Sequence, residues 1–180
     1  MNDETLMLAY CGGNATAFEN LYNRHKGSVY RYLKRQCGNE ATADELFQEV
    51  WINIVKARTR YKASAKFTTW LYHIAHNRLI DHYRKNSRLP DSYQEELPDD
   101  IEDTFSIDPV SDINRDRQAE KLLDCIAQLP EAQRESFLLK EESGLSLLDI
   151  AEVAGTSRET VKSRLRYALN ALRRCLRGLL

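Results

Sequence analysis

The chain has 180 residues, 42% of them apolar, which is enough for one ordinary domain or two small ones and excludes disorder throughout. Its formal net charge is only −1, but residues 56–88 hold nine Lys or Arg against one acid, and residues 155–180 hold seven against one. Because these basic blocks are concentrated, the near-neutral total does not exclude a nucleic-acid partner.

The first 40 residues predict two helices, since apolar residues recur there at intervals of three and four rather than alternating. A short helix around Leu6 is expected to stop at residues 12–13, which are both glycine. A longer one should open at Asn14 or Thr16 and end near Gly38.

A third helix, for which Thr42 is the expected cap, continues to about residue 57. One of its sides is apolar, and the other carries acids and amides that could accept hydrogen bonds from a basic partner. These polar residues are Asp44, Glu45, Gln48, Glu49 and Asn53. From composition alone, a plain solvated face is the simpler interpretation.

A fourth helix is predicted over residues 67–85, after a loop rich in Lys and Arg. Its core stripe is expected to comprise Phe67, Trp70, Leu71, Ile74, Ala75 and Leu79. Other polar and aromatic side chains of this helix should lie off the stripe, namely Tyr72, His73, His76 and Asn77.

The segment from residue 86 to residue 115 contains nine acids, two bases and three of the four prolines, so it predicts a linker rather than a core. Two further helices should follow it, the first over about 116–128 and the second beginning at Pro130. The fold class is therefore all-α, with two small helical domains on a flexible acidic tether.

The last 35 residues predict a helix-turn-helix. Ser146 can cap a helix that ends at Gly155, and Thr156 or Ser157 can cap the helix that follows. The second helix has an apolar side and a basic side that suits phosphates and guanine edges. Its basic face could instead be a solvated helix end that complements the helix dipole.

The four cysteines, at positions 11, 37, 125 and 175, form no C-x-x-C motif, so neither structural zinc nor a disulfide scaffold is expected. No apolar run of 18 residues occurs, and the N-terminus lacks a secretion signal. We expect a cytoplasmic protein with reduced thiols and no direct membrane insertion.

Four ordered phrases resemble a bacterial RNA polymerase sigma factor of the extracytoplasmic-function type, in the sigma-70 family. They are AFENLYNRHKGSVYRYL, ADELFQEVWINIVKA, KFTTWLYHIAHNRLIDHYRK and LPEAQRESFLLKEESGLSLLDIAEVAGTSRETVKSRL. The resemblance implies region 2 over residues 1–86, an acidic linker over 87–114 and region 4 over 115–180. It implies transcription initiation at specific promoters by DNA recognition and melting, with no catalytic residue, cofactor or metal.

The resemblance also assigns partners to residues. The third helix would bind the clamp helices of the largest subunit of core RNA polymerase, with the flap as a further contact. The residues implied to read and melt the −10 element are Lys62, Lys66, Tyr72, His73, His76, Asn77 and Arg84. Those implied to read the −35 element are Arg158, Glu159, Thr160, Lys162, Ser163, Arg164, Arg166 and Tyr167, although relatives often carry a basic residue in place of Tyr167. An anti-sigma factor is a further implied partner, able to hold the chain at the membrane.

Two other classes fit less well. A metalloenzyme could use His73, His76, Asp81 and His82, which all lie on one predicted helix. However, His82 lies about 120° around the helix from His76, and no second helix offers a matching ligand cluster. An ordinary repressor or response regulator would use the helix-turn-helix alone, and would need a receiver or ligand-binding domain that the N-terminal half does not resemble. Such a regulator binds duplex DNA unaided, whereas a sigma factor of this type is expected to need the core enzyme.

Overall fold

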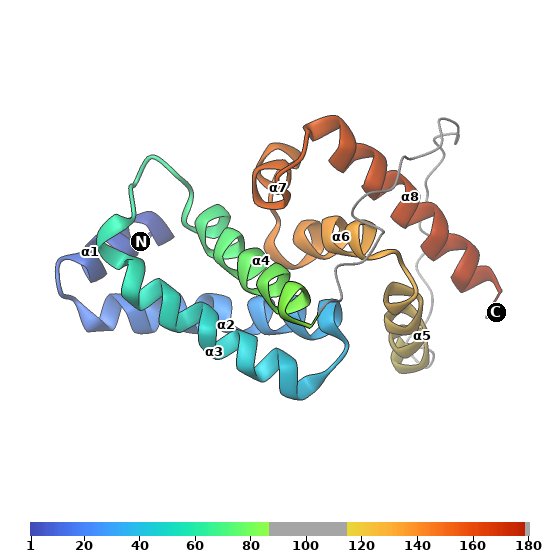
Figure 1. Cartoon of the computed structure of the whole chain (residues 1–180), viewed down its shortest axis with the longest axis horizontal. Helices are drawn as coiled ribbons and strands as arrows, with labels where there is room; N and C mark the ends of the chain where they lie inside the picture. Colours follow the sequence, from blue (N-terminus) through green and yellow to red (C-terminus); the bar gives the residue numbers. More distant parts are fainter. Residues whose placement is uncertain (87–114, 179–180) are drawn as a thin grey trace.

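The computed structural model describes residues 1–86 and 115–178, and all regular elements within these ranges are helical (Figure 1). The N-terminal half comprises α1 (Asp3–Cys11), α2 (Ala15–Cys37), α3 (Glu40–Ala57), the short 3-10 helix η1 (Arg58–Arg60) and α4 (Phe67–Lys85). The C-terminal half comprises α5 (Arg115–Ala127), α6 (Glu131–Ser143), α7 (Leu147–Ala154) and α8 (Arg158–Arg177). The predicted all-α class is confirmed, while the acidic linker predicted at 87–114 lies outside the described residues.

Side-chain caps set where most of these helices begin. Asn2, Asn14, Asn39, Ser146 and Ser157 each accept a hydrogen bond from the backbone N–H three residues later. Such caps satisfy N–H groups of the first turn that have no partner within the helix. The expectation of a cap at Thr42 was wrong, because Asn39 fills that place and α3 starts at Glu40. Pro130 likewise precedes α6 rather than opening it.

The N-terminal half is built around one core between α2, α3 and α4, over which α1 packs. The predicted stripe of α4 is largely confirmed, since Phe67, Leu71, Ala75 and Leu79 are fully buried. An aromatic group closes the side between α2 and α3, where the rings of Tyr22 and Trp51 lie 4.9 Å apart. Rings in such edge-on contact add stability beyond their buried area, so this side of the bundle is firmly packed.

The C-terminal half contains a disulfide, contrary to the prediction made from the cysteine spacing. Cys125 of α5 and Cys175 of α8 are bonded, with their Cα atoms 5.8 Å apart, whereas Cys11 and Cys37 are free thiols. The expectation was wrong because it relied on spacing, and these two cysteines are 50 residues apart in the sequence. They meet only because α5 packs back against α8.

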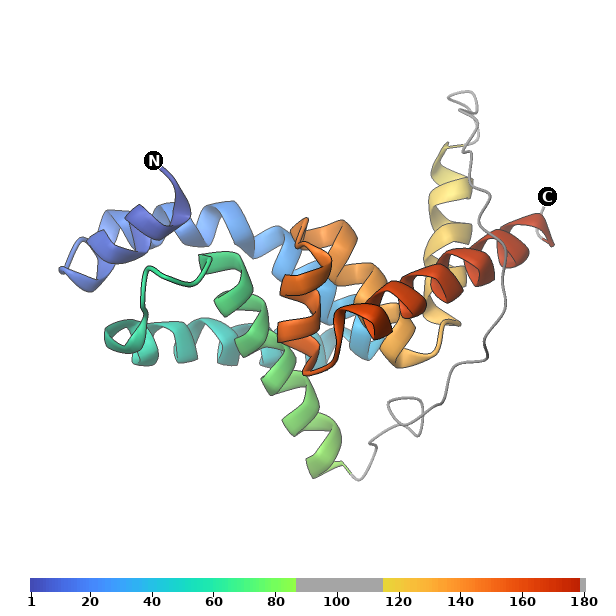
Figure 2. The same cartoon turned by 90° about the horizontal axis from the view of Figure 1, so that it is seen from above.

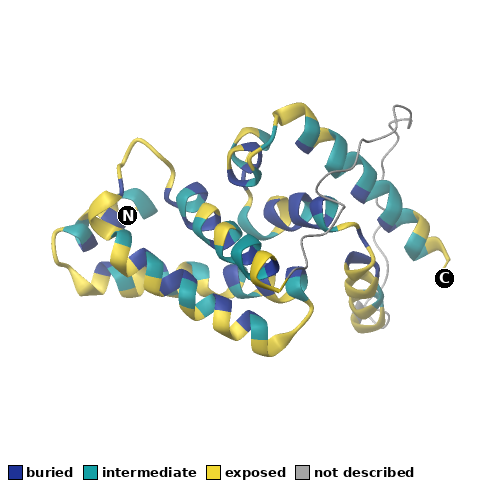
Figure 3. Cartoon of the chain, in the orientation of Figure 1, coloured by how far each residue is buried: buried dark blue, intermediate teal, exposed yellow. Residues whose placement is uncertain are grey.

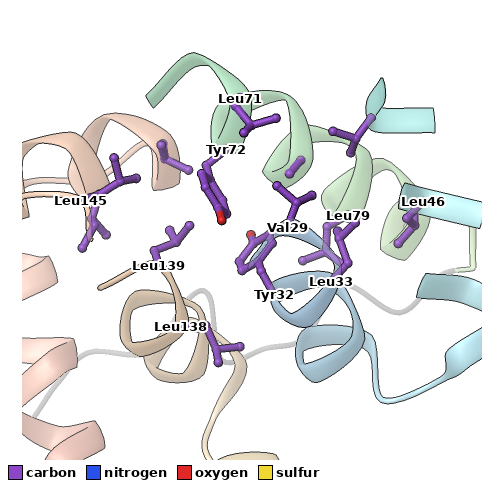
Figure 4. Packing of buried hydrophobic residues seen from close by; sticks show 14 of the residues in the cluster. Val29, Tyr32, Leu33, Leu46, Leu71, Tyr72, Leu79, Leu138, Leu139 and Leu145 are labelled. Atoms are coloured by element: carbon purple, nitrogen blue, oxygen red, sulfur yellow. The ribbon is translucent and has the colours of Figure 1, made fainter. Parts of the chain in front are cut away.

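The two halves lie in contact, with α6 against α2 and α7 against α4 (Figures 1 and 2). Tyr72 of α4 points toward the space between Tyr32 of α2 and Leu139 of α6 (Figure 4). These three side chains and Leu138 of α6 are all buried. The rings of the two tyrosines meet edge-on, with centroids 5.6 Å apart. The hydrophobic core therefore continues from one predicted domain into the other.

Candidate nucleic-acid interface

The helix-turn-helix is formed by α7 and α8. Gly155 ends α7 with φ 67°, a left-handed conformation that glycine adopts at little cost, and this lets the chain turn within three residues. The N–H of Thr156 bonds to the carbonyl of Ala151 at 3.0 Å and closes the turn. Ile150 and Val161 are fully buried between the helices. The turn and this buried pair together set how α8 leaves α7.

The start of α8 is its most exposed part. Arg158 and Glu159 keep 53% and 77% of their side-chain surface, and Lys162 is also exposed. Thr160, Ser163 and Arg164 are half-buried beside them. A recognition helix contacts base edges with its N-terminal residues, so these positions are arranged as a DNA-reading face requires.

Arg166 and Tyr167 differ from the other residues predicted to read the −35 element. The guanidinium of Arg166 lies 5.8 Å from the centre of the Tyr167 ring, and both side chains are half-buried. The Arg166 Nε and the Tyr167 hydroxyl are buried and lack a hydrogen-bond partner within the described part of the chain. Their polar ends are therefore less available to a ligand than those of Arg158 or Lys162.

On α4, His73, Asn77 and Arg84 are exposed, and the Asn77 amide lies 3.3 Å from the Nδ1 atom of His73. Tyr72, which was expected off the core stripe, is instead fully buried. Burial raises the pKa of its hydroxyl to about 12. The expectation considered only the N-terminal core, whereas α7 also packs against α4 and Leu139 of α6 lies close to the Tyr72 ring (Figure 4).

His76 and Lys66 are also engaged by the C-terminal half. The Nδ1 atom of His76 bonds to the carboxylate of Glu135 in α6, and the ammonium of Lys66 lies 3.0 Å from the carboxylate of Asp149 in α7. Lys62 is exposed in the loop before α4. The neighbouring Tyr61 is buried, and this burial is the main cause that raises the pKa of its hydroxyl to about 12. Within the −10 set, Tyr72 and His76 are therefore covered, whereas Lys66 is paired with Asp149 but keeps 64% of its side-chain surface.

Exposed positions of α3 line the lower edge of the molecule in Figure 3. Within its polar row Asp44 is exposed, while Glu49 and Asn53 are half-buried. Glu45 and Gln48 are exposed, whereas the Asn53 amide donates to the Glu49 carbonyl at 2.8 Å. Asp44 accepts a 2.8 Å hydrogen bond from the hydroxyl of Tyr30. This bond raises the pKa of Tyr30 to about 12. A hollow of about 430 Å³ between α3 and α4 includes Glu45 and Glu49 in its wall.

Several residues at the contact between the halves were not singled out in the sequence. Arg134 and Glu135 of α6 are buried although charged, and Gln36 of α2 is buried although polar. Arg134 donates to the Gln36 carbonyl at 3.1 Å, and the Tyr32 hydroxyl donates to Glu135 at 2.8 Å. Arg134 and Glu135 lie one helical turn before the buried Leu138 and Leu139, so they are on the same side of α6. This spacing is the only sequence signal that could have indicated their burial.

No group of three or more His, Cys, Asp or Glu side chains suited to a metal ion occurs in residues 1–86 and 115–178. None of the helices in these ranges is both long and apolar enough to cross a membrane. Exposed cations gather in the segment that leads from the end of α3 to α4, and two more are exposed at the start of α8. They are Lys56, Arg58, Arg60, Lys62 and Lys66 in that segment, and Arg158 and Lys162 on α8.

Comparison with known proteins gives two matching family models. Residues 21–89 match sigma-70 region 2, and residues 119–172 match sigma-70 region 4. The chain is 30% identical over 178 residues to the ECF RNA polymerase sigma factor SigW of Bacillus subtilis (strain 168), which covers 93% of this chain and 92% of that protein. It is also 30% identical over 165 residues to the RNA polymerase sigma factor CarQ of Myxococcus xanthus, covering 91% of each.

Two solved structures have a similar fold. One is CnrH in complex with the cytosolic domain of CnrY, with a TM-score of 0.71 and 22% identity over 98% of this chain and 97% of that one. The other is the sigma factor RpoE in complex with the anti-sigma factor NepR from Bartonella quintana, with a TM-score of 0.68 and 19% identity over 89% and 96%. At these identities the likeness concerns the fold alone.

Proposed function

The chain belongs to the extracytoplasmic-function sigma factors of RNA polymerase, and we propose how its described surfaces divide the work of that activity. It directs promoter-specific transcription by core RNA polymerase and is a DNA-binding initiation factor rather than a classical enzyme. The observation that carries the proposal is the position of the cations. They are exposed inside the region 2 match, in the segment before α4, and inside the region 4 match, at the start of the second helix of the helix-turn-helix.

In this proposal α8 reads the −35 element. Arg158 and Lys162 lie at the exposed start of the helix, where a side chain can reach a guanine edge or a phosphate. Thr160, Ser163 and Arg164 flank them and complete the face. Glu159 suits a cytosine amino group, which donates to carboxylates in the major groove.

The loop before α4 and the exposed side of α4 engage the −10 element. Lys62, Lys66 and Arg84 supply positive charge for the displaced strand, while His73 and Asn77 supply polar contacts and a ring. The half-buried His76 and the buried Tyr72 become available only if the C-terminal half moves away from α4.

The exposed face of α3 binds the core polymerase. Glu45 and Gln48 project freely and are suited to accept hydrogen bonds from basic groups of the clamp helices. Asp44 also accepts hydrogen bonds from the polymerase, and the bond from the Tyr30 hydroxyl holds the Asp44 carboxylate in one orientation. Glu49 and Asn53 continue the same row, and Glu49 also lines the hollow next to α4.

A partner protein is expected to restrain this activity in the cell. Two proteins of similar fold were solved as complexes, CnrH with the cytosolic domain of CnrY and RpoE with the anti-sigma factor NepR. By analogy, an anti-sigma factor would cover the docking or DNA-binding surfaces of this chain in the cytoplasm, and could hold it at the membrane. The analogy concerns architecture, so the partner's identity is left to experiment.

Run-off transcription of fragmented bacterial DNA by core RNA polymerase, with and without the protein, tests the function. We expect new 5′ ends that appear only with the protein and share a spaced −35 and −10 pair. The absence of new starts, with folded protein and competent core enzyme, would contradict the proposal. High-affinity binding of the free protein to duplex promoters would instead favour a conventional regulator.

Two variants test the division of labour. Replacing Lys162 and Arg164 by Ala should weaken −35 recognition while core binding persists, because these side chains lie on α8 far from α3 in sequence and structure. Replacing Glu45 and Gln48 by Ala should weaken core binding instead. Co-purification with core enzyme and open-complex formation are the two readouts. Equal loss of core binding in both variants would refute the assignment.

A further inference from the structure

The connection between α3 and α4, residues 58–66, comprises η1 and the loop that follows it. Its exposed cations are Arg58, Arg60, Lys62 and Lys66, and the proposed function gives the two lysines to the −10 strand. Within the loop, the Tyr61 hydroxyl donates to the Ala65 carbonyl at 2.9 Å, and the Ala65 N–H bonds to the Lys62 carbonyl at 3.2 Å. These bonds shape the middle of the connection, while both of its ends are held from outside by α1.

α1 lies against η1 and α4 (Figure 1), and its last turn holds the first end of the connection. The Cys11 thiol donates to the Arg58 carbonyl at 2.9 Å. The Arg58 guanidinium lies 5.2 Å from the centre of the Tyr10 ring, a distance at which cation and ring attract each other. The main chain and the side chain of Arg58 are therefore both engaged by α1.

The first turn of α1 holds the second end. The Glu4 carboxylate accepts a 2.8 Å hydrogen bond from the backbone nitrogen of Phe67, the first residue of α4. Tyr61 is buried, and the centre of its ring lies 5.2 Å from that of Trp70 and 6.3 Å from that of Phe67. The connection is thus packed onto the start of α4, and the place where the two join is bonded to α1.

α1 is itself fastened to the rest of the N-terminal half. Asp3 bonds to the Nε2 atom of His25 at 2.7 Å and accepts a 2.9 Å hydrogen bond from Arg24 of α2. The apolar side of α1 also packs into the N-terminal core. The bonds at the two ends of the connection therefore tie it to the helical bundle rather than to a free end of the chain.

We propose that α1 is a positioning element for −10 recognition, which through Glu4 and Cys11 holds the connection in the arrangement that binds the displaced strand. A segment that is ordered before binding loses less conformational freedom when the strand arrives. Were the connection loose, only the fraction of chains in the competent arrangement would bind. Glu4 and Cys11 act through the connection and do not touch DNA themselves. This inference rests on the −10 role that the proposed function gives to the connection.

The test compares three double variants. The Ala pair, Glu4→Ala with Cys11→Ala, removes the acceptor and the donor that hold the two ends. The conservative pair, Glu4→Gln with Cys11→Ser, keeps an oxygen acceptor and a donor at the same positions. The matched control, Glu19→Ala with Cys37→Ala, removes an exposed acid and a free thiol from α2 instead.

Each variant is assembled with core enzyme, and its affinity is measured for the displaced −10 strand of a promoter mapped by run-off transcription. The same strand with single bases substituted gives the base preference. Binding to core enzyme and to duplex −35 DNA is measured in parallel. These two readouts report surfaces on α3 and α8, which the variants leave unchanged, and so they reveal a general loss of stability.

We expect the Ala pair to bind the −10 strand about tenfold more weakly than the control and with less base preference, because the connection must then be ordered on binding. Its core and −35 binding should equal those of the control, and the conservative pair should bind the strand as the control does. Equal −10 affinity and preference in the Ala pair and the control would overturn the proposal. An equal loss of core, −35 and −10 binding would overturn it too.

Should the Ala pair fail to fold, Cys11→Ala alone decides the matter. It removes one hydrogen bond, so we expect about threefold weaker −10 strand binding than in Cys37→Ala, with core binding unchanged. No difference between these two single variants overturns the proposal.

Amide hydrogen exchange of residues 58–66 in the free chain separates this inference from the proposed function, because it reports the order of the connection without DNA. Faster exchange in the Ala pair than in the control supports the positioning role, and equal exchange overturns it even where transcription starts are normal. An unaltered chain that produces no starts rejects the function instead, and the exchange comparison still decides whether α1 orders the connection.

Discussion

The carboxylate of Glu4 accepts a hydrogen bond from the backbone nitrogen of Phe67 at 2.8 Å, and so α1 supplies the cap that α4 lacks at its own start. Lys66, which precedes α4, makes no side-chain cap bond. An acid at a helix N-terminus satisfies a free N–H and complements the helix dipole. α1 thereby fixes the first turn of α4, although it precedes the residues that match region 2.

Replacing Glu4 by Ala should lower the free energy of unfolding by about 1–2 kcal/mol, because the first turn of α4 loses its acceptor. Glu4→Gln keeps an oxygen acceptor and should lose less. Urea denaturation followed by circular dichroism measures both, with Glu19→Ala, an exposed acid of α2, as the control. If Glu4→Ala and Glu19→Ala unfold at the same urea concentration, the cap contributes nothing.

The local sequence pattern was sufficient to predict the helices, but it could not predict the cap that Glu4 provides for α4. The limits of each helix follow from the spacing of its apolar residues and from the Asn, Ser or Gly at its ends. These signals lie within a few residues of the helix end that they mark. The bond from Phe67 to Glu4 joins residues 63 positions apart, and nothing near either residue indicates it. Glu4 alone reads as an ordinary acid in the first turn of α1.

The Cys125–Cys175 bond should raise the stability of the C-terminal half by about 4 kcal/mol, since a cross-link over 50 residues removes much of the unfolded chain's freedom. We expect Cys175→Ala to unfold at lower urea than the oxidised protein, and reduction to have a similar effect. Cys37→Ala, which removes a free thiol, is the comparison. A reducing agent that leaves the transition unchanged would argue against a stabilising role.

Thiol titration checks the bond itself. The chain has four cysteines, and two of them, Cys11 and Cys37, are free. In denaturant, the oxidised protein should react at these two positions alone, and all four should react after reduction. Four reactive thiols without reduction would show that the bond does not form.

Asp149 is expected to make the free energy of unfolding depend on pH in the acidic range. Partial burial favours its protonation, but hydrogen bonds from Ser146 and Lys66 outweigh this and hold the pKa below the ordinary value of 3.8. A carboxyl whose pKa is lower in the folded state adds stability above its unfolded pKa, and this is lost as pH falls through the folded value. The stability difference between the unaltered chain and Asp149→Asn should therefore shrink below about pH 4. A difference that stays constant would contradict this.

The helix-turn-helix was predictable because its parts are local, namely the Ser146 cap, the turn at Gly155 and the Ser157 cap. The contact between the halves was not. Glu135 looks like a solvated acid until its partners Tyr32 and His76 are known, and these lie 103 and 59 positions away. Helical periodicity shows which side of a helix is buried in its own bundle, but not which polar sides meet another bundle.

We expect the hydroxyl of Tyr167 to be dispensable for both stability and −35 binding. That group is buried and has no hydrogen-bond partner among residues 1–86 and 115–178. Removing an unpaired buried hydroxyl loses no hydrogen bond, so Tyr167→Phe should leave stability unchanged or slightly higher. Thermal unfolding and −35 binding by the holoenzyme measure the two effects. Weaker promoter binding by Tyr167→Phe would show that the hydroxyl reaches DNA.

Replacing Arg158 and replacing Lys162 should change promoter binding in different ways. A guanidinium that binds a guanine edge contributes about 1–3 kcal/mol of discrimination, so Arg158→Ala should relax preference at one base of the −35 element. An ammonium on a phosphate adds affinity without preference, so Lys162→Ala should weaken binding to all promoters and lower its salt dependence. Open-complex formation by holoenzyme on promoters substituted base by base measures both. Arg177→Ala, at the far end of α8, is the control and should change neither property.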